Sequence, residues 1–337
     1  MPNEHGLTRT RSAASKFFIA RATAPTLPSF FGSTNTIRVR GRTSARYIQR
    51  GIFLGMRVAL KIAYDGRSFY GHQRQPDRRT VEGECIAALR SARLIGDPKE
   101  AFFRSASRTD RGVSAIGNVI AFDASLLPEA VLGAFNDKAR DVWAWAAAGV
   151  PDGFHPRHAV ERWYRYHILD DLPLGKLRRA AATFVGPHDF RSFSKEDVPE
   201  SMVIRRIDVT RSRESTLIDV RSRSFRRGMV RRIVAAMEAV ARDQATIEQL
   251  RLALAGTRRD FGSVPPEPLV LMDVTYDLPF HVALKPKVVA EWRQRERESL
   301  LRLQLFRAAR AGAENGVLFG DGPRFLGPES VWRLSDD

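Results

Sequence analysis

From residue 57 onward, the hydrophobic positions of the chain repeat with two different periods. Residues 57–64 place Val58, Leu60 and Ile62 on one side, which is the alternation of a strand. The same criterion predicts strands at 57–64, 116–123, 141–150, 160–169, 203–211, 216–225 and 269–276. Helical spacing and start signals predict helices at 81–94 after an N-cap at Thr80, at 128–138 from Pro128, and at 174–185, 228–242 and 246–255.

The order of these elements favours one class of fold. Strands come in adjacent runs with helices between them, which is typical of an α+β protein with a largely antiparallel, mixed sheet and flanking helices. The β and α elements recur in a similar order in the second half of the chain, without identity of letters. We therefore predict an N-terminal half at 56–170, a C-terminal half at 171–280 and a helical tail at 281–337.

The tail continues past the last predicted strand with a different composition. Residues 285–311 are rich in Arg and Glu and carry Trp292, Leu300, Leu303, Leu305 and Phe306. This pattern predicts an amphipathic helix that either packs on the rest of the protein or extends a nucleic-acid contact.

The residues before the first strand also differ from the rest. Residues 1–55 carry nine Lys or Arg and one acid, Glu4, and so contribute +8 of the net charge of +17. Three interpretations are open: a basic tail that grips RNA, an organelle transit peptide, or sequence upstream of the true start. The last is favoured because Met56 opens the first clean strand pattern, and we expect most of the segment to be poorly ordered.

Charge narrows the class of partner. A net charge of +17 and a pI of about 10.8 attract polyanions, and nucleic acid is the first candidate because bound phosphates release counterions. An anionic membrane surface is the second candidate, but no long basic amphipathic helix with an aromatic apolar face is present. No run approaches eighteen apolar residues, so we expect a soluble protein that does not span a membrane.

Cysteine usage adds little chemistry. Cys85 is the single cysteine and cannot form an internal disulfide, and no Cys/His cluster has the spacing of zinc ligands. Cys85 falls within a predicted helix among small and apolar residues, so we expect it to be a packing residue. The sequence therefore predicts an intracellular protein without a metal.

A row of arginines stands on one predicted strand. On the predicted strand 216–225, one face carries Leu217, Asp219, Arg221, Arg223 and Phe225. Such a row suits contact with phosphate or ribose, although an ordinary solvated face explains it equally well.

The most informative segment is 107–115, which reads Ser-Arg-Thr-Asp-Arg-Gly-Val-Ser-Ala. Asp110 lies in a short polar turn between strand-like stretches, and Gly112 permits a backbone conformation that few other residues adopt. Taken alone, such an Asp more often satisfies the amides of a turn than performs catalysis.

Five segments in order resemble the TruA family of tRNA pseudouridine synthases, and together they cover about residues 56–277. Residues 107–115 are similar to that family's active-site loop, Arg-Thr-Asp-x-Gly-Val-x-Ala. The other four resemble the family's opening strand and loop (Tyr64-Asp65-Gly66, Phe69-Tyr70-Gly71 and Gln73-Arg74-Gln75), its R-x-Y-R-Y strand (Glu161–Tyr166), its D-F-x-S-F segment (His188–Phe193) and its F-x-x-x-M-V-R-x-I-V helix (Phe225–Val234). The resemblance implies a pseudouridine synthase fold with two similar, RRM-like halves around a central cleft.

Three positions depart from the pattern of bacterial members. Arg111 and Ser114 stand where those members often have Ala and His, and His72 stands where they often have Trp. None of these changes removes a catalytic group, and the chain resembles archaeal members.

Roles for individual residues follow from the resemblance. Asp110 matches the catalytic carboxylate, which the chemistry also requires, because breaking the N–C1′ bond of uridine needs a positioned group that stabilises or traps the sugar. Arg231 matches the arginine that pairs with this Asp, Tyr164 the tyrosine that lies against the target base, and Arg108 an arginine that helps to hold the flipped nucleotide. We expect further RNA contacts from Arg74, Arg111, Arg221 and Arg223.

The resemblance further implies a cytoplasmic homodimer that binds tRNA and modifies uridines of the anticodon stem-loop, at one or more of positions 38, 39 and 40. No cofactor and no metal is expected, because the isomerisation changes neither redox state nor atom count. Two alternatives are a non-catalytic RNA-binding protein on the same scaffold and an Asp-dependent hydrolase. A glycosidase normally needs a second carboxylate, and none stands out in the matching segments.

Overall fold

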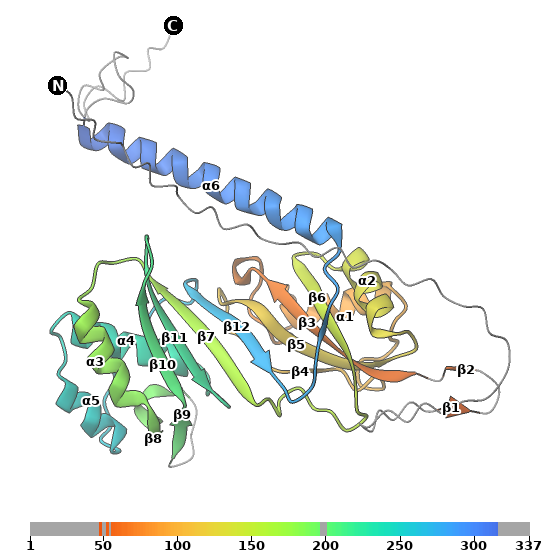
Figure 1. The fold of residues 1–337 in the computed structure, drawn as a ribbon, viewed down its shortest axis with the longest axis horizontal. Coiled ribbons are helices and arrows are strands. Elements are labelled where there is room, and N and C mark those ends of the chain that lie inside the picture. The colour runs from red at the N-terminus through yellow and green to blue at the C-terminus, as the bar shows by residue number, and fades with distance from the viewer. Residues whose placement is uncertain (1–46, 49–51, 54, 196–200, 316–337) are drawn as a thin grey trace, which may run out of the picture. The chain divides into compact units, whose positions relative to one another are not determined.

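The computed structural model describes residues 47–48, 52–53, 55–195 and 201–315 (Figure 1). The predicted extension at 1–55 therefore lies outside the described residues except for 47–48, 52–53 and 55. The strands are β1 Tyr47–Ile48, β2 Ile52–Phe53, β3 Met56–Tyr64, β4 Arg104–Ser105, β5 Ser114–Ala124, β6 Val142–Val150, β7 Glu161–Ile168, β8 Gly186–His188, β9 Met202–Ile204, β10 Arg206–Arg211, β11 Thr216–Ser222, β12 Leu269–Thr275 and β13 His281–Val282. The α-helices are α1 Val81–Ser91, α2 Pro128–Lys138, α3 Leu174–Phe184, α4 Met229–Ala241, α5 Ile247–Leu254 and α6 Pro286–Asn315, with 3-10 turns at Gly66–Ser68 and Arg191–Phe193.

One large sheet forms the centre of the fold. Its strand order is β10-β11-β7-β12-β5-β3-β6-β13, and β4 pairs with β5 beside this path. Every neighbouring pair is antiparallel except β12 and β5, which run parallel. The predicted α+β class with a largely antiparallel, mixed sheet is therefore confirmed.

The sheet contains the same arrangement twice. Along the chain, β3-α1-β4-β5-α2-β6 and β7-α3-β10-β11-α4-β12 share the order of a split β-α-β unit, which is also the order of an RRM. In the sheet, the first unit runs β4-β5-β3-β6 and the second runs β10-β11-β7-β12, so equivalent strands occupy equivalent places. The two similar halves inferred from the sequence are present in the topology. β7, predicted to close the N-terminal half, opens the second unit in this order.

The two units join where β12 meets the start of β5. The parallel register pairs Val270 with Ser114 and Leu271 with Ala115. β4 occupies the same edge of β5 further along, opposite Ile120 and Ala121. The loop between β4 and β5 therefore emerges at the seam between the two units, because the first residues of β5 are those that pair across it.

Apolar side chains between the sheet and the helices form the core. The largest fully buried side chains include Phe122, Phe135, Phe184, Phe190 and Phe193. Figure 1 shows α1 and α2 next to β3 and β6, and α3 next to β10, with α4 and α5 packed against α3. Cys85 is fully buried on α1, as predicted, and the predicted N-cap is confirmed because the Thr80 hydroxyl accepts a hydrogen bond from the Gly83 amide.

Two strand predictions were wrong at their ends. The predicted strand 203–211 is divided into β9, which pairs with β8, and β10, which joins the main sheet. The predicted strand 216–225 ends at Ser222, after which the chain leaves the sheet for α4 through Gly228 at φ +72°. Arg223 and Phe225 therefore do not extend the face that carries Arg221. The strands β4, β8 and β13 were not predicted, because two or three residues are too few to show a period.

The tail forms the helix α6, but the prediction that it is amphipathic was wrong. Val288 and Trp292 near its start pack against Ala63 and Trp143, where the two tryptophan rings meet edge to face with centroids 6.3 Å apart. Further along, the large apolar side chains are exposed and point to several sides of the helix: Leu300, Leu301, Leu303, Leu305 and Phe306. None of the described helices combines the length and apolar composition needed to cross a bilayer.

Candidate active site

Buried hydrogen bonds hold the loop between β4 and β5 in place. Asn118 on β5 accepts a hydrogen bond from the Ser107 amide at 3.2 Å and donates one to the Ser107 carbonyl at 3.0 Å. Its amide also donates to the Tyr64 hydroxyl, which lies 2.9 Å from the Thr109 hydroxyl. Burial raises the pKa of Tyr64, so this hydroxyl stays protonated and the network remains neutral. The residues on both sides of Arg108 are thereby anchored to the sheet.

Gly112 lets this loop turn tightly against the second unit. Its φ of +88° is a conformation that favours glycine, and a Cβ there would lie 3.0 Å from Pro266 and 3.1 Å from Glu267. Both the backbone conformation and the lack of space for a Cβ therefore require glycine at this position, as predicted.

Asp110 lies at the partly exposed end of this loop between two arginines, Arg231 on α4 and Arg227 just before it. Arg231 Nη1 lies 3.3 Å from Asp110 Oδ2, and Arg227 Nε lies 3.8 Å from Oδ1. The Asp110 side chain is 28% exposed, the Arg231 side chain 17% and the Arg227 side chain 68%. Arg231 is fixed further by a 2.8 Å hydrogen bond from its Nε to the Val264 carbonyl. The carboxylate is thus accessible from one side and held by a rigid cation on the other.

Tyr164 on β7 is the third member of the group. Its side chain is buried, and its ring packs edge to face against Phe225 with centroids 5.2 Å apart. Burial raises the pKa of Tyr164, and the nearby Asp110 charge adds to the increase. Tyr164 therefore keeps its proton and lies within electrostatic reach of Asp110.

A buried arginine that the sequence reasoning did not single out ties these parts together. Arg162 Nε donates to the Ser107 hydroxyl at 3.0 Å, and Nη2 donates to the Ala106 carbonyl at 3.1 Å and the Arg157 carbonyl at 3.0 Å. Nη1 donates to the Arg223 carbonyl, just before Phe225. Because Arg162 alternates in phase with buried Tyr164 and Tyr166 on one strand, its burial was visible in the sequence as an arginine on an apolar face.

His72 lies beneath the same loop. Its amide donates to the Thr109 carbonyl at 3.0 Å, and its ring is buried without a hydrogen-bond partner for either nitrogen among the described residues. Burial lowers the pKa of His72 to about 4, and the charge of Arg108 contributes to the decrease. The ring is therefore neutral at physiological pH.

Comparison with known proteins identifies the family of this chain. Residues 180–277 match the profile of a family described as tRNA pseudouridine synthase. Proteins named tRNA pseudouridine synthase A from Thermococcus sibiricus and Pyrococcus horikoshii are 43% and 40% identical to this chain. The first match covers 66% of this chain and 85% of that protein, and the second covers 74% and 97%. The chain belongs to the tRNA pseudouridine synthase A family. This is a family of isomerases, and the resemblance to archaeal members is confirmed.

A further relative of the same name, from Methanococcoides burtonii, is 39% identical over 74% of this chain and 94% of its own length. Among solved structures, a Cbf5-Nop10-Gar1 complex matches at 13% identity with a TM-score of 0.32, over 69% of this chain and 52% of that chain. A TM-score this low adds nothing to the assignment of the family.

The basic residues expected to contact RNA lie in different places. Arg108 and Arg111 are exposed beside Asp110, and Arg74 is exposed on the loop that precedes α1. Arg223 is exposed just beyond the end of β11. Arg221 pairs in register with Trp163, whereas its neighbour Val220 pairs with Tyr164, so Arg221 faces the opposite side of the sheet from Tyr164.

Arg221 is also neutralised locally. Its guanidinium group lies over the Trp163 ring at 4.2 Å from the centroid and forms an ion pair with Glu161 at 3.2 Å. The structure therefore brings Asp110, Tyr164 and Arg231 together, with Arg108 and Arg111 alongside, and places Arg221 apart from them.

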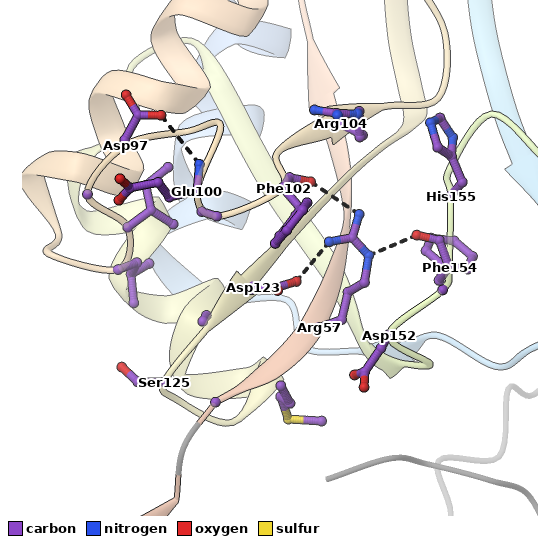
Figure 2. Close-up of a pocket in the computed structure, with 18 residues that line it drawn as sticks. Arg57, Asp97, Glu100, Phe102, Arg104, Asp123, Ser125, Asp152, Phe154 and His155 are labelled. Carbon is purple, nitrogen blue, oxygen red and sulfur yellow. Dashed lines mark hydrogen bonds and ion pairs between the residues drawn. The ribbon is translucent and has the colours of Figure 1, made fainter. Parts of the chain in front are cut away.

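A separate hollow opens at the edge of the first unit, near the start of β3 (Figure 2). At its floor the Arg57 guanidinium group donates hydrogen bonds to Asp123 and to the Phe154 and Phe102 carbonyls, as Figure 2 shows. Its lining carries four carboxylates, two arginines and one histidine: Asp97, Glu100, Asp123, Asp152, Arg57, Arg104 and His155. None of the predicted site residues lines it, and its excess of acids disfavours RNA phosphates.

Proposed function

We propose that this chain converts uridine in tRNA to pseudouridine, with Asp110 as the catalytic carboxylate. The observation that carries the proposal is the partly exposed Asp110 carboxylate, paired with the fixed guanidinium group of Arg231 at the seam between the two halves. Membership of the tRNA pseudouridine synthase A family supports both the reaction and the class of substrate.

The chemistry assigns a part to each side chain. Isomerisation breaks the bond between N1 of the base and C1′ of the ribose, turns the base and joins C5 to C1′, while C5 loses a proton and N1 gains one. Asp110 stabilises or bonds the sugar as the first bond breaks, and Arg231 keeps the carboxylate charged and oriented. Tyr164 lies against the base, with its hydroxyl proton retained because burial raises the pKa of Tyr164.

The target nucleotide has to leave its stack before Asp110 can reach it. Base flipping costs a few kcal/mol, which RNA enzymes offset with phosphate contacts and stacking. Exposed arginines lie next to Asp110 along the chain and across from it: Arg108, Arg111 and Arg227. We assign these residues to holding the extruded nucleotide and its neighbouring phosphates.

The finer features of the proposal follow from the family resemblance. We propose that the target uridines lie in the anticodon stem-loop and that the protein acts as a homodimer in the cytoplasm. Reacting a set of tRNA transcripts with the purified protein and mapping each pseudouridine tests the target position, and sedimentation tests the dimer.

Replacement of Asp110 tests the catalytic assignment. Asp110→Asn keeps the size of the side chain and removes its charge, so we expect no detectable pseudouridine in an unmodified tRNA transcript. The matched control is Asp137→Asn, which removes an exposed carboxylate from α2 and should react like wild type.

Each alternative has its own outcome in this experiment. Pseudouridine formed by Asp110→Asn would show that another residue is the catalytic carboxylate. If the wild type binds tRNA but forms no pseudouridine, the protein is an RNA-binding module. Release of free uracil would identify a glycoside hydrolase.

A further inference from the structure

Tyr70 forms an aromatic and cationic stack beside the catalytic loop. Its side chain is exposed, with 40% of its surface accessible. The guanidinium carbon of Arg111 lies 4.5 Å from the centre of the Tyr70 ring, and that of Arg78 lies 4.7 Å from it. Two cations thus cover one exposed aromatic side chain.

Backbone contacts fix this stack against Asp110. A Cβ on Gly71, which has a φ of +98°, would lie 3.3 Å from the Arg111 amide nitrogen and 3.5 Å from the Thr109 carbonyl. The chain around Tyr70 can approach this closely only because residue 71 is glycine. Arg111 itself directly follows Asp110, so one of the two cations of the stack lies on the same loop as the carboxylate.

The loop that carries Arg78 is also a built structure. The Tyr70 amide donates to the Arg79 carbonyl at 2.8 Å, and the Gln75 side chain donates to the Tyr70 carbonyl at 2.9 Å. Gln75 and Arg78 form a β-bridge across the turn. Arg78 is therefore held near the Tyr70 ring by its backbone and not only by its own flexible side chain.

The two arginines of this stack differ from their neighbour Arg79 in how their charges are paired. Among the described residues, neither Arg78 nor Arg111 forms an ion pair with a carboxylate. The neighbouring Arg79 also lies over an aromatic ring, that of Phe69, but it pairs with Glu84 and Asp141.

A second ring, that of Trp163, also lies beneath guanidinium groups whose charges are paired with carboxylates. Arg165 and Arg221 both lie over Trp163, and they pair with Asp219 and Glu161.

Arg295, which lies over Trp143, is likewise paired with Asp141 and Glu291. Arg259 over Phe261 forms no ion pair among the described residues, but it is a single cation on its ring. The Tyr70 stack differs from these stacks in leaving two guanidinium groups on one ring available to an anion.

We propose that Tyr70, Arg78 and Arg111 form a binding site for one unpaired nucleotide that flanks the target uridine. Its base stacks on the Tyr70 ring or on a guanidinium plane above it, and the two guanidinium groups bind the adjacent phosphates. Aromatic rings and guanidinium planes are the surfaces on which proteins stack unpaired RNA bases, and arginine binds phosphate with two parallel hydrogen bonds. This inference rests on the proposed function, since Asp110 marks where the target lies.

Binding of an unmodified tRNA transcript to three variants, compared with a control variant, tests the site. Stacking of one base predicts that Tyr70→Leu, which keeps apolar bulk without a π face, raises the Kd about ten-fold, while Tyr70→Phe changes it less than about two-fold. A phosphate contact predicts that Arg111→Met raises the Kd and lowers the slope of log K against log salt by about one.

The matched control removes an arginine of similar exposure elsewhere on the first unit. Arg90 lies on α1, donates to the Gly96 carbonyl and pairs loosely with Asp97 at 3.8 Å. Arg90→Met should leave both the Kd and the salt slope unchanged. Thermal unfolding of each variant checks that the fold is retained, which the exposure of Tyr70 favours.

An abasic substitution in the RNA places the contact beside the target. Removing the base on one side of the target uridine should weaken binding of wild type about ten-fold and leave binding of Tyr70→Leu unchanged, because the two changes remove the same contact. Additive effects at both flanking positions would overturn the proposed site. So would a Kd for Tyr70→Leu equal to that of wild type, or a salt slope for Arg111→Met equal to that of Arg90→Met.

Pseudouridine formation by wild type on the same transcript separates this inference from the function on which it rests. If wild type forms pseudouridine and the variants bind normally, only the nucleotide site is wrong. If wild type forms none, the proposed function fails and the inference fails with it.

Discussion

The two arginines that flank Asp110 should contribute very differently to the reaction. Arg231 lies 3.3 Å from one carboxylate oxygen and is mostly buried, whereas Arg227 lies 3.8 Å from the other and is mostly exposed. Replacing each in turn by methionine removes one charge from the same carboxylate. Comparing the two variants therefore shows how far the burial of a cation, and not only its distance from the carboxylate, decides its effect on the reaction rate.

The expected magnitudes follow from the geometry. With an effective dielectric constant of about 20, charges 3.3 Å apart attract by about 5 kcal/mol, which is an upper limit for Arg231. After desolvation, a hydrogen bond to a charged group retains about 1.5–3 kcal/mol, so Arg231→Met should slow the chemical step about ten- to 150-fold. For the solvated Arg227, charges 3.8 Å apart attract by about 1 kcal/mol in water, and salt reduces this further. We expect less than about a five-fold loss for Arg227→Met.

Single-turnover kinetics with saturating enzyme measures the chemical step apart from tRNA binding. Arg231→Lys is a useful third variant, because it keeps the charge but loses the hydrogen bond from Nε to the Val264 carbonyl. It should fall between wild type and Arg231→Met. Equal losses for Arg231→Met and Arg227→Met, or no loss for Arg231→Met, would refute the reasoning that a rigid, partly buried counter-charge supports Asp110.

Two further predictions concern residues beneath the loop that carries Asp110. Arg162→Lys keeps the charge but cannot reach the four oxygen acceptors that Arg162 now serves, so it should lower the free energy of unfolding by about 3 kcal/mol. Because Ser107 anchors the Asp110 loop, the variant should also lower kcat by a larger factor than it changes KM. A change in KM alone would contradict this role. The pKa of folded His72 is about 4, below the ordinary value of 6.5, so the unfolded chain takes up a proton first as the pH falls. Urea unfolding should show a loss of about 2 kcal/mol in stability between pH 7 and pH 5 from this group, and His72→Phe should abolish that part of the pH dependence.

The local sequence pattern was sufficient to predict most of the helices and strands. It also identified the loop that carries Asp110. The alternation of β3 and β7, the Thr80 cap of α1 and the apolar stripe of α4 are each encoded within about a dozen residues. The repeated order of elements likewise anticipated the two similar halves. Where pattern failed, the elements were very short, or a strand ended for a reason outside its own sequence, as at Ser222. The amphipathic character predicted for the tail also failed, because the large apolar side chains in the later part of α6 are spread around the helix and exposed.

The tertiary structure decided which of these residues meet. Asp110 and Arg231 are 121 positions apart, and they approach each other only because β12 pairs with the start of β5 and joins the two units at the loop that carries Asp110. Strand register likewise turned Arg221 to the face opposite Tyr164.

The hydrogen-bond partners of buried charged side chains could not be predicted from the sequence either. Arg162 is buried beside the loop that carries Asp110 because four oxygen atoms from distant segments surround its guanidinium group. A hydrophobic period reports which face of a segment is buried, because side chains return to the same face every two residues in a strand and every three or four residues in a helix. The partner of a buried charge depends on segments brought together by sheet pairing, and no local pattern contains that information.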